Sequence, residues 1–459
     1  RRPYECDGLS AYRRVPGLVA LPRSIDEVAA VLKCCQEHGV PVVTRGAGTG
    51  LSGGALPHEQ GLLLSLARLN RILEIDPQNR TATVEPGVRN LAISEAAAVH
   101  GLYYAPDPSS QIACSIGGNV AENAGGVHCL KYGLTVHNVF GIKFLTIDGE
   151  LVTLGGKVLD SPGYDLLALL TGSEGMLGVI VEVTVKLLPI PERAQVMMAA
   201  FDNVERAGEA VAAIIGAGII PAGLEMMDNA AIRAAEAYVH AGYPTEAAAI
   251  LLCELDGTNA EVSEGLLLVR AILLDHGATA MRTAADEAER LQLWAGRKAA
   301  FPAVGRLSPD YYCMDGTIPR KHLGRVLKRI GELSKEYNLP VANVFHAGDG
   351  NLHPLILYDA NRPGELERTE EFGGRILELC IEVGGTITGE HGVGVEKINQ
   401  MCIQFRPPEL TQFHAVKQAF DPEGLLNPGK AVPTLHRCAE FGRLHVHGGK
   451  LRHPELERF

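Results

Sequence analysis

The chain has few aromatic residues and no excess of basic ones. Aromatic side chains make up 5% of its 459 residues, and 54 acidic residues outnumber 42 basic ones, which gives a net charge of −12. Nucleic acids attract basic surfaces, so this charge balance argues against a nucleic-acid partner. The chain also lacks an uninterrupted apolar stretch of about 20 residues, the length that a membrane-spanning helix needs. We therefore expect no transmembrane segment.

Cysteines are present, but their spacing excludes one common use. None of the ten cysteines belongs to a C-x-x-C motif, a spacing typical of iron–sulfur ligands. We therefore expect reduced thiols, a cytoplasmic protein and no iron–sulfur cluster held by this chain.

The first half of the sequence predicts an α+β unit. The capping box Ser24-Ile-Asp-Glu27 begins a helix that Gly39 ends, and an apolar strand follows at Val40–Thr44. Further strands surround one more helix, and Pro189 marks a linker after the last of them. These strands are Gly61–Leu66, Thr81–Glu85, Val139–Ile147 and Val179–Leu187, and the helix is Leu91–His100.

The second half predicts a separate sheet covered by helices. Helices are expected at Val204–Gly216, Asn229–His240, Ala260–His276 and Ala284–Ala300, with a strand at Ala248–Leu255. This alternation favours an antiparallel, ferredoxin-like sheet with a histidine-containing hairpin closing it. The length suits several domains, and we expect a cofactor domain at 1–190, a substrate domain at 191–407 and a C-terminal segment, 408–459, that returns to the cofactor domain.

Two short segments concentrate histidine, VFHAGDGNLHPLI and TITGEHGVGVEK. The Asp-Gly pair in the first is a strong hairpin signal, and a loop at 348–351 would place His346 opposite His353. Opposed residues of antiparallel strands have β-carbons about 4.5–5.5 Å apart, which suits two imidazoles that chelate one ion. Glu390 of the second segment would add an oxygen ligand and leave a coordination position open for a substrate. The cluster therefore predicts a divalent metal site at His346, His353 and Glu390.

Two points about this cluster stay open from the residues alone. The chain has 16 histidines, and a single histidine is more often a structural or surface residue than a ligand. Imidazole and carboxylate also suit zinc, manganese and iron alike, so the spacing does not choose the metal.

Three glycine-rich segments form the second group of functional candidates. They are RGAGTGLSGGA from Arg45, PDPSS with SIGGNVAENAGG from Pro106, and GSEGMLGVI from Gly172. Backbone N–H groups without obstructing side chains can form a nest for a pyrophosphate, although tight turns alone would also explain the glycines. Three such stretches together predict a long ligand held by backbone, as a dinucleotide is.

The six motifs RGAGTGLSGGA, PDPSS with SIGGNVAENAGG, GSEGMLGVI, HAGDGNLHP, GEHGVG and FDPEGLLNPGK occur in this order. In this arrangement the chain resembles the FAD-binding 2-hydroxy-acid oxidoreductases of the vanillyl-alcohol-oxidase superfamily, and most of all the FAD-binding subunits of bacterial glycolate oxidases. The resemblance implies a two-part PCMH-type FAD-binding domain and an antiparallel substrate domain. It also implies FAD-containing and iron–sulfur partner subunits and, through them, peripheral attachment to the inner membrane. Since no segment marks a histidine that would tether the flavin, we expect noncovalent FAD.

The motifs assign candidate residues to each role. Arg297 presents a planar fork that matches a carboxylate, and the resemblance gives it the substrate carboxylate, although a solvated arginine on a helix face is the plain alternative. His391 is the expected general base, because imidazole titrates near neutral pH. The expected FAD contacts are Arg45, Gly46, Gly48, Thr49, Gly50, Leu51, Ser52, Gly53, Pro106, Asp107, Ser109, Ser110, Gly117, Gly118, Asn123, Gly125, Gly126, Glu174, Gly178, Ile180 and Asn427.

The function expected from these candidates is flavin-dependent oxidation of a small 2-hydroxy acid to the 2-oxo acid. FAD would accept a hydride while a metal and His391 assist loss of the hydroxyl proton. Phe301, one helical turn beyond Arg297, is apolar and favours a small monocarboxylate such as glycolate or D-lactate. A D-2-hydroxyglutarate-type dehydrogenase, a metal-dependent hydrolase and a flavin-binding assembly subunit without an active site remain alternatives.

Overall fold

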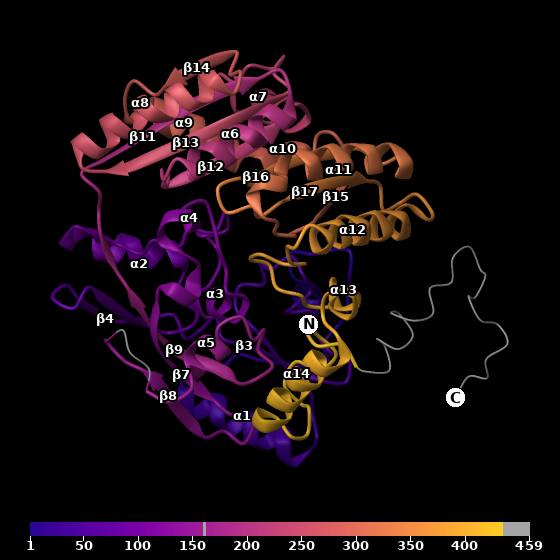
Figure 1. Ribbon diagram of the computed structural model, residues 1–459. Helices are drawn as coiled ribbons and strands as arrows, with labels where there is room; N and C mark the ends of the chain where they lie inside the picture. The colour runs from indigo at the N-terminus through magenta and orange to yellow at the C-terminus, as the bar shows by residue number, and fades with distance from the viewer. Residues whose placement is uncertain (159–161, 435–459) are drawn as a thin grey trace.

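The computed structural model describes residues 1–158 and 162–434, and the chain forms two lobes (Figure 1). The lower lobe holds the first part of the chain, and the upper lobe is built around one large sheet. The end of the predicted C-terminal segment, 435–459, lies outside the described residues. Mixed helix and sheet in these lobes confirms the predicted α+β class.

A small parallel sheet lies in the lower lobe. Its strands are β1 (Leu18–Ala20), β3 (Leu62–Ser65) and β2 (Val42–Arg45), in that order. Helix α1 (Ile25–Glu37) connects β1 to β2, and the Ser24 hydroxyl at its start accepts a hydrogen bond from the Glu27 N–H at 3.2 Å. The capping sequence therefore predicted this helix correctly.

A five-stranded antiparallel sheet completes the lower lobe, in the order β4-β5-β9-β7-β8. The strands are β4 (Ile72–Asp76), β5 (Thr81–Val84), β9 (Val179–Lys186), β7 (Val139–Leu145) and β8 (Leu151–Gly155). The associated helices are α2 (Asn90–Ala97), α3 (Ile116–Glu122), α4 (Cys129–Tyr132) and α5 (Leu166–Leu170), and a two-stranded ribbon pairs β10 (Leu188–Pro189) with β6 (Leu102–Tyr103). Valines at 183 and 185 of β9 share a core with Ile93 of α2 and Ile116 of α3, which fixes the glycine-rich start of α3 over the sheet.

The upper lobe contains a seven-stranded antiparallel sheet, in the order β14-β11-β13-β12-β16-β17-β15. The strands are β14 (Ala280–Thr283), β11 (Arg193–Phe201), β13 (Ala249–Gly257), β12 (Gly223–Asp228), β16 (Val341–His346), β17 (Pro354–Tyr358) and β15 (Asp310–Cys313). The histidine-containing hairpin β16–β17 therefore does not close the sheet as predicted, because β15 lies outside it at the edge.

Helices cover both faces of this sheet, and strand β11 shows the consequence. Met197, Ala199 and Phe201 pack into the core beneath α6, α8, α11 and α12, whereas the alternate residues, such as Val196 and Met198, pack beneath α7, α9 and α10. Successive side chains of a strand point to opposite faces, so both sets are buried. The helices are α6 (Val204–Gly216), α7 (Asn229–Val239), α8 (Asn259–Asp275), α9 (Glu287–Lys298), α10 (Ala300–Val304), α11 (Leu323–Tyr337) and α12 (Glu365–Glu382).

After α13 (Ile398–Gln404) and α14 (Pro407–Phe420), the chain returns to the parallel sheet. The Val42 N–H donates to the Leu425 carbonyl at 2.8 Å, and the Asn427 N–H donates to the Val42 carbonyl at 2.8 Å. These hydrogen bonds join residues 425–427 to the parallel sheet, and the domain boundaries stay a prediction.

Two sequence predictions on composition can also be compared with the structure. Cysteines 6, 34, 35, 114, 129, 253, 313 and 380 are free thiols, in agreement with the reduced thiols predicted at these positions. Within residues 1–158 and 162–434, no helix is both long enough and apolar enough to cross a membrane.

Candidate active site

The β16–β17 hairpin brings His346 and His353 together, but not in the predicted register. His346 pairs with Asn351, so the loop is one residue earlier at each side and His346 and His353 are diagonal neighbours. The turn is fixed by the Gly350 N–H, which donates to the His346 carbonyl at 3.1 Å, with Gly350 at φ +83°. The register differs from the prediction by two residues, and an even shift leaves both side chains on one face. Their ring centroids are 5.1 Å apart.

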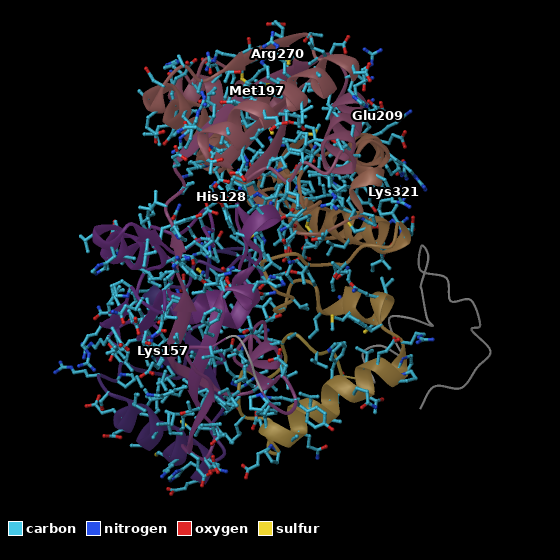
Figure 2. All side chains as sticks on the ribbon, turned by 60° about the vertical axis from the view of Figure 1, so that its left-hand side comes forward. His128, Lys157, Met197, Glu209, Arg270 and Lys321 are labelled. Atoms are coloured by element: carbon cyan, nitrogen blue, oxygen red, sulfur yellow. The ribbon has the colours of Figure 1, made fainter. Side chains whose placement is uncertain are left out.

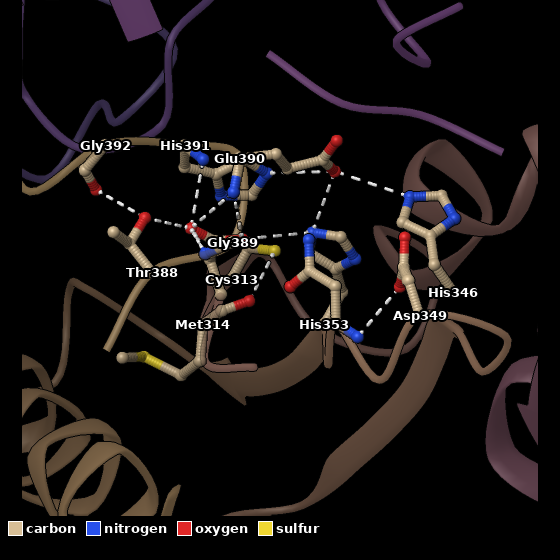
Figure 3. Close-up of polar contacts among 12 residues, drawn as sticks. Cys313, Met314, His346, Asp349, His353, Thr388, Gly389, Glu390, His391 and Gly392 are labelled. Carbon is tan, nitrogen blue, oxygen red and sulfur yellow. Dashed lines mark hydrogen bonds and ion pairs between the residues drawn. The ribbon is translucent and has the colours of Figure 1, made fainter. Parts of the chain in front are cut away.

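Glu390 lies between the two histidines (Figure 3). Its Oε1 is 3.1 Å from Nε2 of His353 and 3.3 Å from Nε2 of His346. One ligand atom from each of these three residues lies within 4.8 Å of the others, an arrangement able to hold a metal ion. The structure therefore brings together the three predicted ligands.

The hydrogen-bonding state of this cluster fits a cation. Within the described residues, Nδ1 of His353 and Oε2 of Glu390 are buried without a hydrogen-bond partner. A buried polar atom left without a partner costs about 1–3 kcal/mol, and a divalent ion would satisfy such atoms directly.

Glu225 of strand β12 orients His346, and the sequence analysis missed it. Its Oε1 accepts a hydrogen bond from Nδ1 of His346 at 2.7 Å, which leaves Nε2 facing Glu390. A carboxylate behind a ligating imidazole fixes the ring and raises its basicity. Burial would raise the pKa of Glu225, but His346 and Arg297 lower it, so the carboxylate is charged. The sequence offered one sign of this role: Glu225 is an acidic residue within the otherwise apolar start of β12.

Arg297 of helix α9 is buried beside the same carboxylate. Its Nε and Nη2 lie 2.8 and 2.7 Å from Oε2 of Glu225. The edge of the guanidinium that the sequence analysis assigned to a substrate carboxylate therefore engages Glu225. Arg297 also lines the cavity described below, and the alternative of a solvated surface arginine is wrong, because the residue is only 1% exposed.

Asp315 is a second residue that the sequence analysis missed. Its carboxylate accepts hydrogen bonds from the backbone N–H groups of Gly389, Glu390 and His391 at 3.1, 3.2 and 3.0 Å. It also accepts one from Nζ of Lys397 at 3.0 Å. Asp315 thus holds the loop that carries Glu390 and His391, and nothing in its local sequence marks it for this role.

His391 lies beside the proposed ligands with its ring centroid 4.9 Å from that of His353. Burial lowers the pKa of His391 to about 4, although Asp315 acts in the opposite direction. Its Nδ1 is buried and has no hydrogen-bond partner among the described residues. The imidazole is therefore neutral near pH 7 with a nitrogen free to accept a proton, but its pKa lies below the near-neutral value on which the sequence prediction relied.

A cavity of about 380 Å³ connects this cluster to the glycine-rich segments. His346, His353, Glu390, His391 and Arg297 line one part of it. The predicted FAD contacts that line the other part are Gly46, Gly48, Thr49, Gly50, Leu51, Ser109, Ser110, Gly117, Gly118, Glu174, Gly178 and Ile180.

The remaining predicted FAD contacts do not line this cavity. They are Arg45, Ser52, Gly53, Pro106, Asp107, Asn123, Gly125, Gly126 and Asn427. Several support the wall from behind: Nδ2 of Asn427 donates to the carbonyls of Gly54 and Glu174, and Nη1 of Arg45 donates to the Cys6 carbonyl at 2.6 Å. Asp107 instead turns towards His128. Position next to a motif glycine therefore did not distinguish lining residues from supporting ones.

The part of the cavity formed by the glycine-rich segments fits a bound dinucleotide. We call it the glycine wall; its glycines are Gly46, Gly48, Gly50, Gly54, Gly117, Gly118, Gly175 and Gly178. A β-carbon at Gly50 would meet no atom closer than 4.0 Å, so it would project into open space, whereas one at Gly46 would collide with the Ser115 hydroxyl. The buried Thr44 hydroxyl, which also lines the cavity, has no partner within the described part of the chain. Exposed backbone and an unused hydroxyl are suitable for a flavin nucleotide.

Comparison with known proteins defines the class. Residues 16–155 match the family model "FAD binding domain", and residues 190–431 match "FAD linked oxidases, C-terminal domain". The chain belongs to the FAD-linked oxidases and binds FAD.

Individual relatives confirm the resemblance to FAD-dependent 2-hydroxy-acid oxidoreductases. The chain is 70% identical over 457 residues to glycolate oxidase subunit GlcD of Escherichia coli (strain K12), covering 100% of this chain and 92% of that protein. It is 33% identical to D-lactate dehydrogenase of Anaerostipes hadrus, covering 94% and 92%. In fold it resembles p-cresol methylhydroxylase, with a TM-score of 0.76 at 18% identity over 95% and 92% of the two chains. The PCMH-type fold is thereby confirmed.

Proposed function

We propose that the protein oxidises a small 2-hydroxy acid, glycolate or D-lactate, to the corresponding 2-oxo acid. The observation that carries this proposal is that the glycine wall and the His–Glu cluster line one cavity. A substrate bound between them would meet the flavin and the metal together. Relatives named glycolate oxidase subunit and D-lactate dehydrogenase support this substrate class.

The residues of the cluster divide into three roles. His346, His353 and Glu390 would hold a divalent ion (zinc, manganese or iron), and Arg297 would contribute positive charge towards the substrate carboxylate. Bound in this cavity, FAD supplies a hydride acceptor, and a divalent ion lowers the pKa of a coordinated hydroxyl. His391 would take the hydroxyl proton, since its imidazole is neutral and close to the ligands.

Phe301 favours a small substrate over a dicarboxylate. Its ring lines the cavity and lies 6.3 Å from the His353 ring and 6.2 Å from the Tyr311 ring, measured between centroids. A second carboxylate packed against this ring would lose hydration, and it would have to reach Lys298, the basic side chain that also lines the cavity, to gain a partner. This supports glycolate or D-lactate over the D-2-hydroxyglutarate alternative. The hydrolase alternative loses its support, because both family models describe FAD proteins.

The domain organisation, the partners and the location of the protein are also proposals. We infer a cofactor domain at 1–190, a substrate domain at 191–407 and a returning segment at 408–459, in line with the separate sheets. Because a relative is named as a subunit, we also propose FAD-containing and iron–sulfur partner subunits. A cytoplasmic location with peripheral attachment to the inner membrane through those partners completes the proposal. The His346, His353 and Glu390 cluster beside Arg297 on the cavity wall supports a catalytic role over a purely structural assembly subunit.

An anaerobic panel of 2-hydroxy acids tests the proposed function. Flavin absorbance should bleach rapidly with glycolate or D-lactate and slowly with D-2-hydroxyglutarate. Equal bleaching by all acids would remove the substrate assignment, and bleaching by none would overturn the proposal.

A further inference from the structure

His128 lies at the junction of the two lobes, outside the cavity lining (Figure 2). It follows the glycine-rich segment of the lower lobe and immediately precedes the short helix α4. Its backbone N–H donates to Oδ1 of Asp107 at 3.1 Å, and its ring Nδ1 lies 2.8 Å from Oδ2 of the same carboxylate. Asp107 belongs to the Pro106–Ser110 segment, whose two serines line the cavity.

The other nitrogen of the same ring reaches the upper lobe. Nε2 of His128 is 3.1 Å from Oε1 of Glu254 on strand β13. Oε2 of Glu254 accepts hydrogen bonds from Nη1 of Arg290 at 2.7 Å and from Nε1 of Trp294 at 2.5 Å. Both donors belong to helix α9, which also carries Arg297.

The His128 imidazole therefore connects the Pro106–Ser110 segment, through Glu254, to helix α9. Both ring nitrogens face carboxylate oxygens, so both must donate, and the ring must be protonated to do this. Burial opposes that charge, but Asp107 and Glu254 together raise the pKa of His128 to about 10. The two contacts of the protonated His128 ring, with Asp107 and with Glu254, form a bridge between the lobes. This bridge is intact across the neutral pH range.

We infer that His128 is a positioning residue that sets the separation between the flavin-binding segment and helix α9, and so the placement of Arg297 relative to the flavin. This inference rests on the proposed function, since it takes FAD on the Pro106–Ser110 segment and substrate near Arg297. A misplacement of about 1 Å can cost roughly 100-fold in rate, so a fixed separation has catalytic value.

Two substitutions separate the two ends of the bridge. Asparagine carries its amide nitrogen near the place of Nδ1, so His128→Asn keeps a donor for Asp107 and loses the one for Glu254. Glutamine reaches the place of Nε2, so His128→Gln keeps the donor for Glu254 and loses the side-chain donor for Asp107. Trp294 is the only tryptophan of the chain, and its fluorescence therefore reports directly on Glu254.

In the holoenzyme, we expect each substitution to change one property and leave the other unchanged: His128→Asn the Trp294 emission, and His128→Gln the FAD affinity. His128→Asn should shift the Trp294 emission and raise the KM for the 2-hydroxy acid about tenfold or more, with FAD affinity unchanged. His128→Gln should weaken FAD binding about tenfold and leave the Trp294 emission unchanged. In a double-mutant cycle, His128→Asn and Arg297→Lys should be less than additive in kcat/KM, because both act through Arg297.

Lys131 provides the matched control. Its Nζ donates to the backbone carbonyl of Asp256 at 2.7 Å, which also links α4 to strand β13 without reaching α9. Lys131→Met should leave KM, FAD affinity and Trp294 emission within twofold of wild type. The inference is overturned if both His128 variants behave as Lys131→Met does, or if each changes Trp294 emission and FAD affinity together. Because neither the emission nor FAD affinity depends on turnover, failure of the proposed substrate to bleach the flavin remains a separate result.

Discussion

The two walls of the cavity are built in opposite ways. The cofactor wall is lined by glycines and other small residues from segments far apart in the sequence, with two carboxylates, Glu122 and Glu174, among them. The opposite wall carries buried titratable side chains: Glu225 holds the His346 ring, and Asp315 holds the backbone of the loop with Glu390 and His391. Backbone N–H groups can bind a cofactor without taking part in the reaction. Proton transfer and metal binding, in contrast, need side chains that are held in place. We therefore expect substitutions in the cofactor wall to impair FAD binding and substitutions in the opposite wall to impair metal binding or turnover.

The largest effect is expected at His391. His391→Ala should lower the rate of flavin reduction by about 10²- to 10⁴-fold, because the proton acceptor is lost. Metal and FAD content should stay at wild-type levels, as measured by elemental analysis and flavin absorbance. A reduction rate within a few-fold of wild type would remove His391 from the base role.

The next effect is expected at the ligands themselves. His353→Ala should release the metal on dialysis and abolish substrate-driven bleaching, while FAD remains bound. His100→Ala, at an exposed position, is the control and should change neither. Full metal content in the His353 variant would show that this histidine is not a ligand.

A smaller loss, of metal affinity, is expected at Glu225, which contacts the proposed ligand His346. Glu225→Gln should weaken metal affinity about 10- to 100-fold, because His346 loses the carboxylate that orients it. Metal titration of the apoprotein measures this directly. An unchanged metal affinity would mean that Glu225 serves only the buried Arg297.

The sequence predicted much of this site, and its failures follow one physical pattern. The ligands His346, His353 and Glu390 lie in motifs with turn glycines, so local sequence was sufficient to find them. Glu225 and Asp315 act across the fold, on residues far from them in the chain, and no local spacing reports such contacts. Strand β11 was missed for a related reason: both its faces are buried, so it has no polar alternation to detect.

Substrate specificity should depend on Phe301, the apolar residue that lines the cavity beside His353. Phe301→Ala should raise the ratio of kcat/KM for D-2-hydroxyglutarate to that for glycolate by about tenfold, a typical effect of side-chain volume in a pocket. Phe413→Ala, on helix α14 and partly exposed, is the control and should leave the ratio unchanged. An unchanged ratio in the Phe301 variant would place the limit on substrate length elsewhere.

The smallest effect is expected on the glycine wall. Gly46→Ala should weaken FAD binding by about fivefold, equivalent to about 1 kcal/mol, because the added methyl group meets a Ser115 hydroxyl that can rotate away. Metal affinity should not change. Gly216→Ala, where an added β-carbon meets nothing within 4 Å, is the control for the substitution itself. Loss of metal in the Gly46 variant would contradict the separation of the two walls.

The proposed function requires both walls of the cavity to act on one substrate. The most direct measurement is anaerobic bleaching of the flavin by glycolate or D-lactate in protein whose metal has been removed by a chelator. We expect FAD to remain bound, bleaching to be lost, and bleaching to return when a divalent ion is added back. Bleaching at the full rate in the metal-free protein would contradict the account.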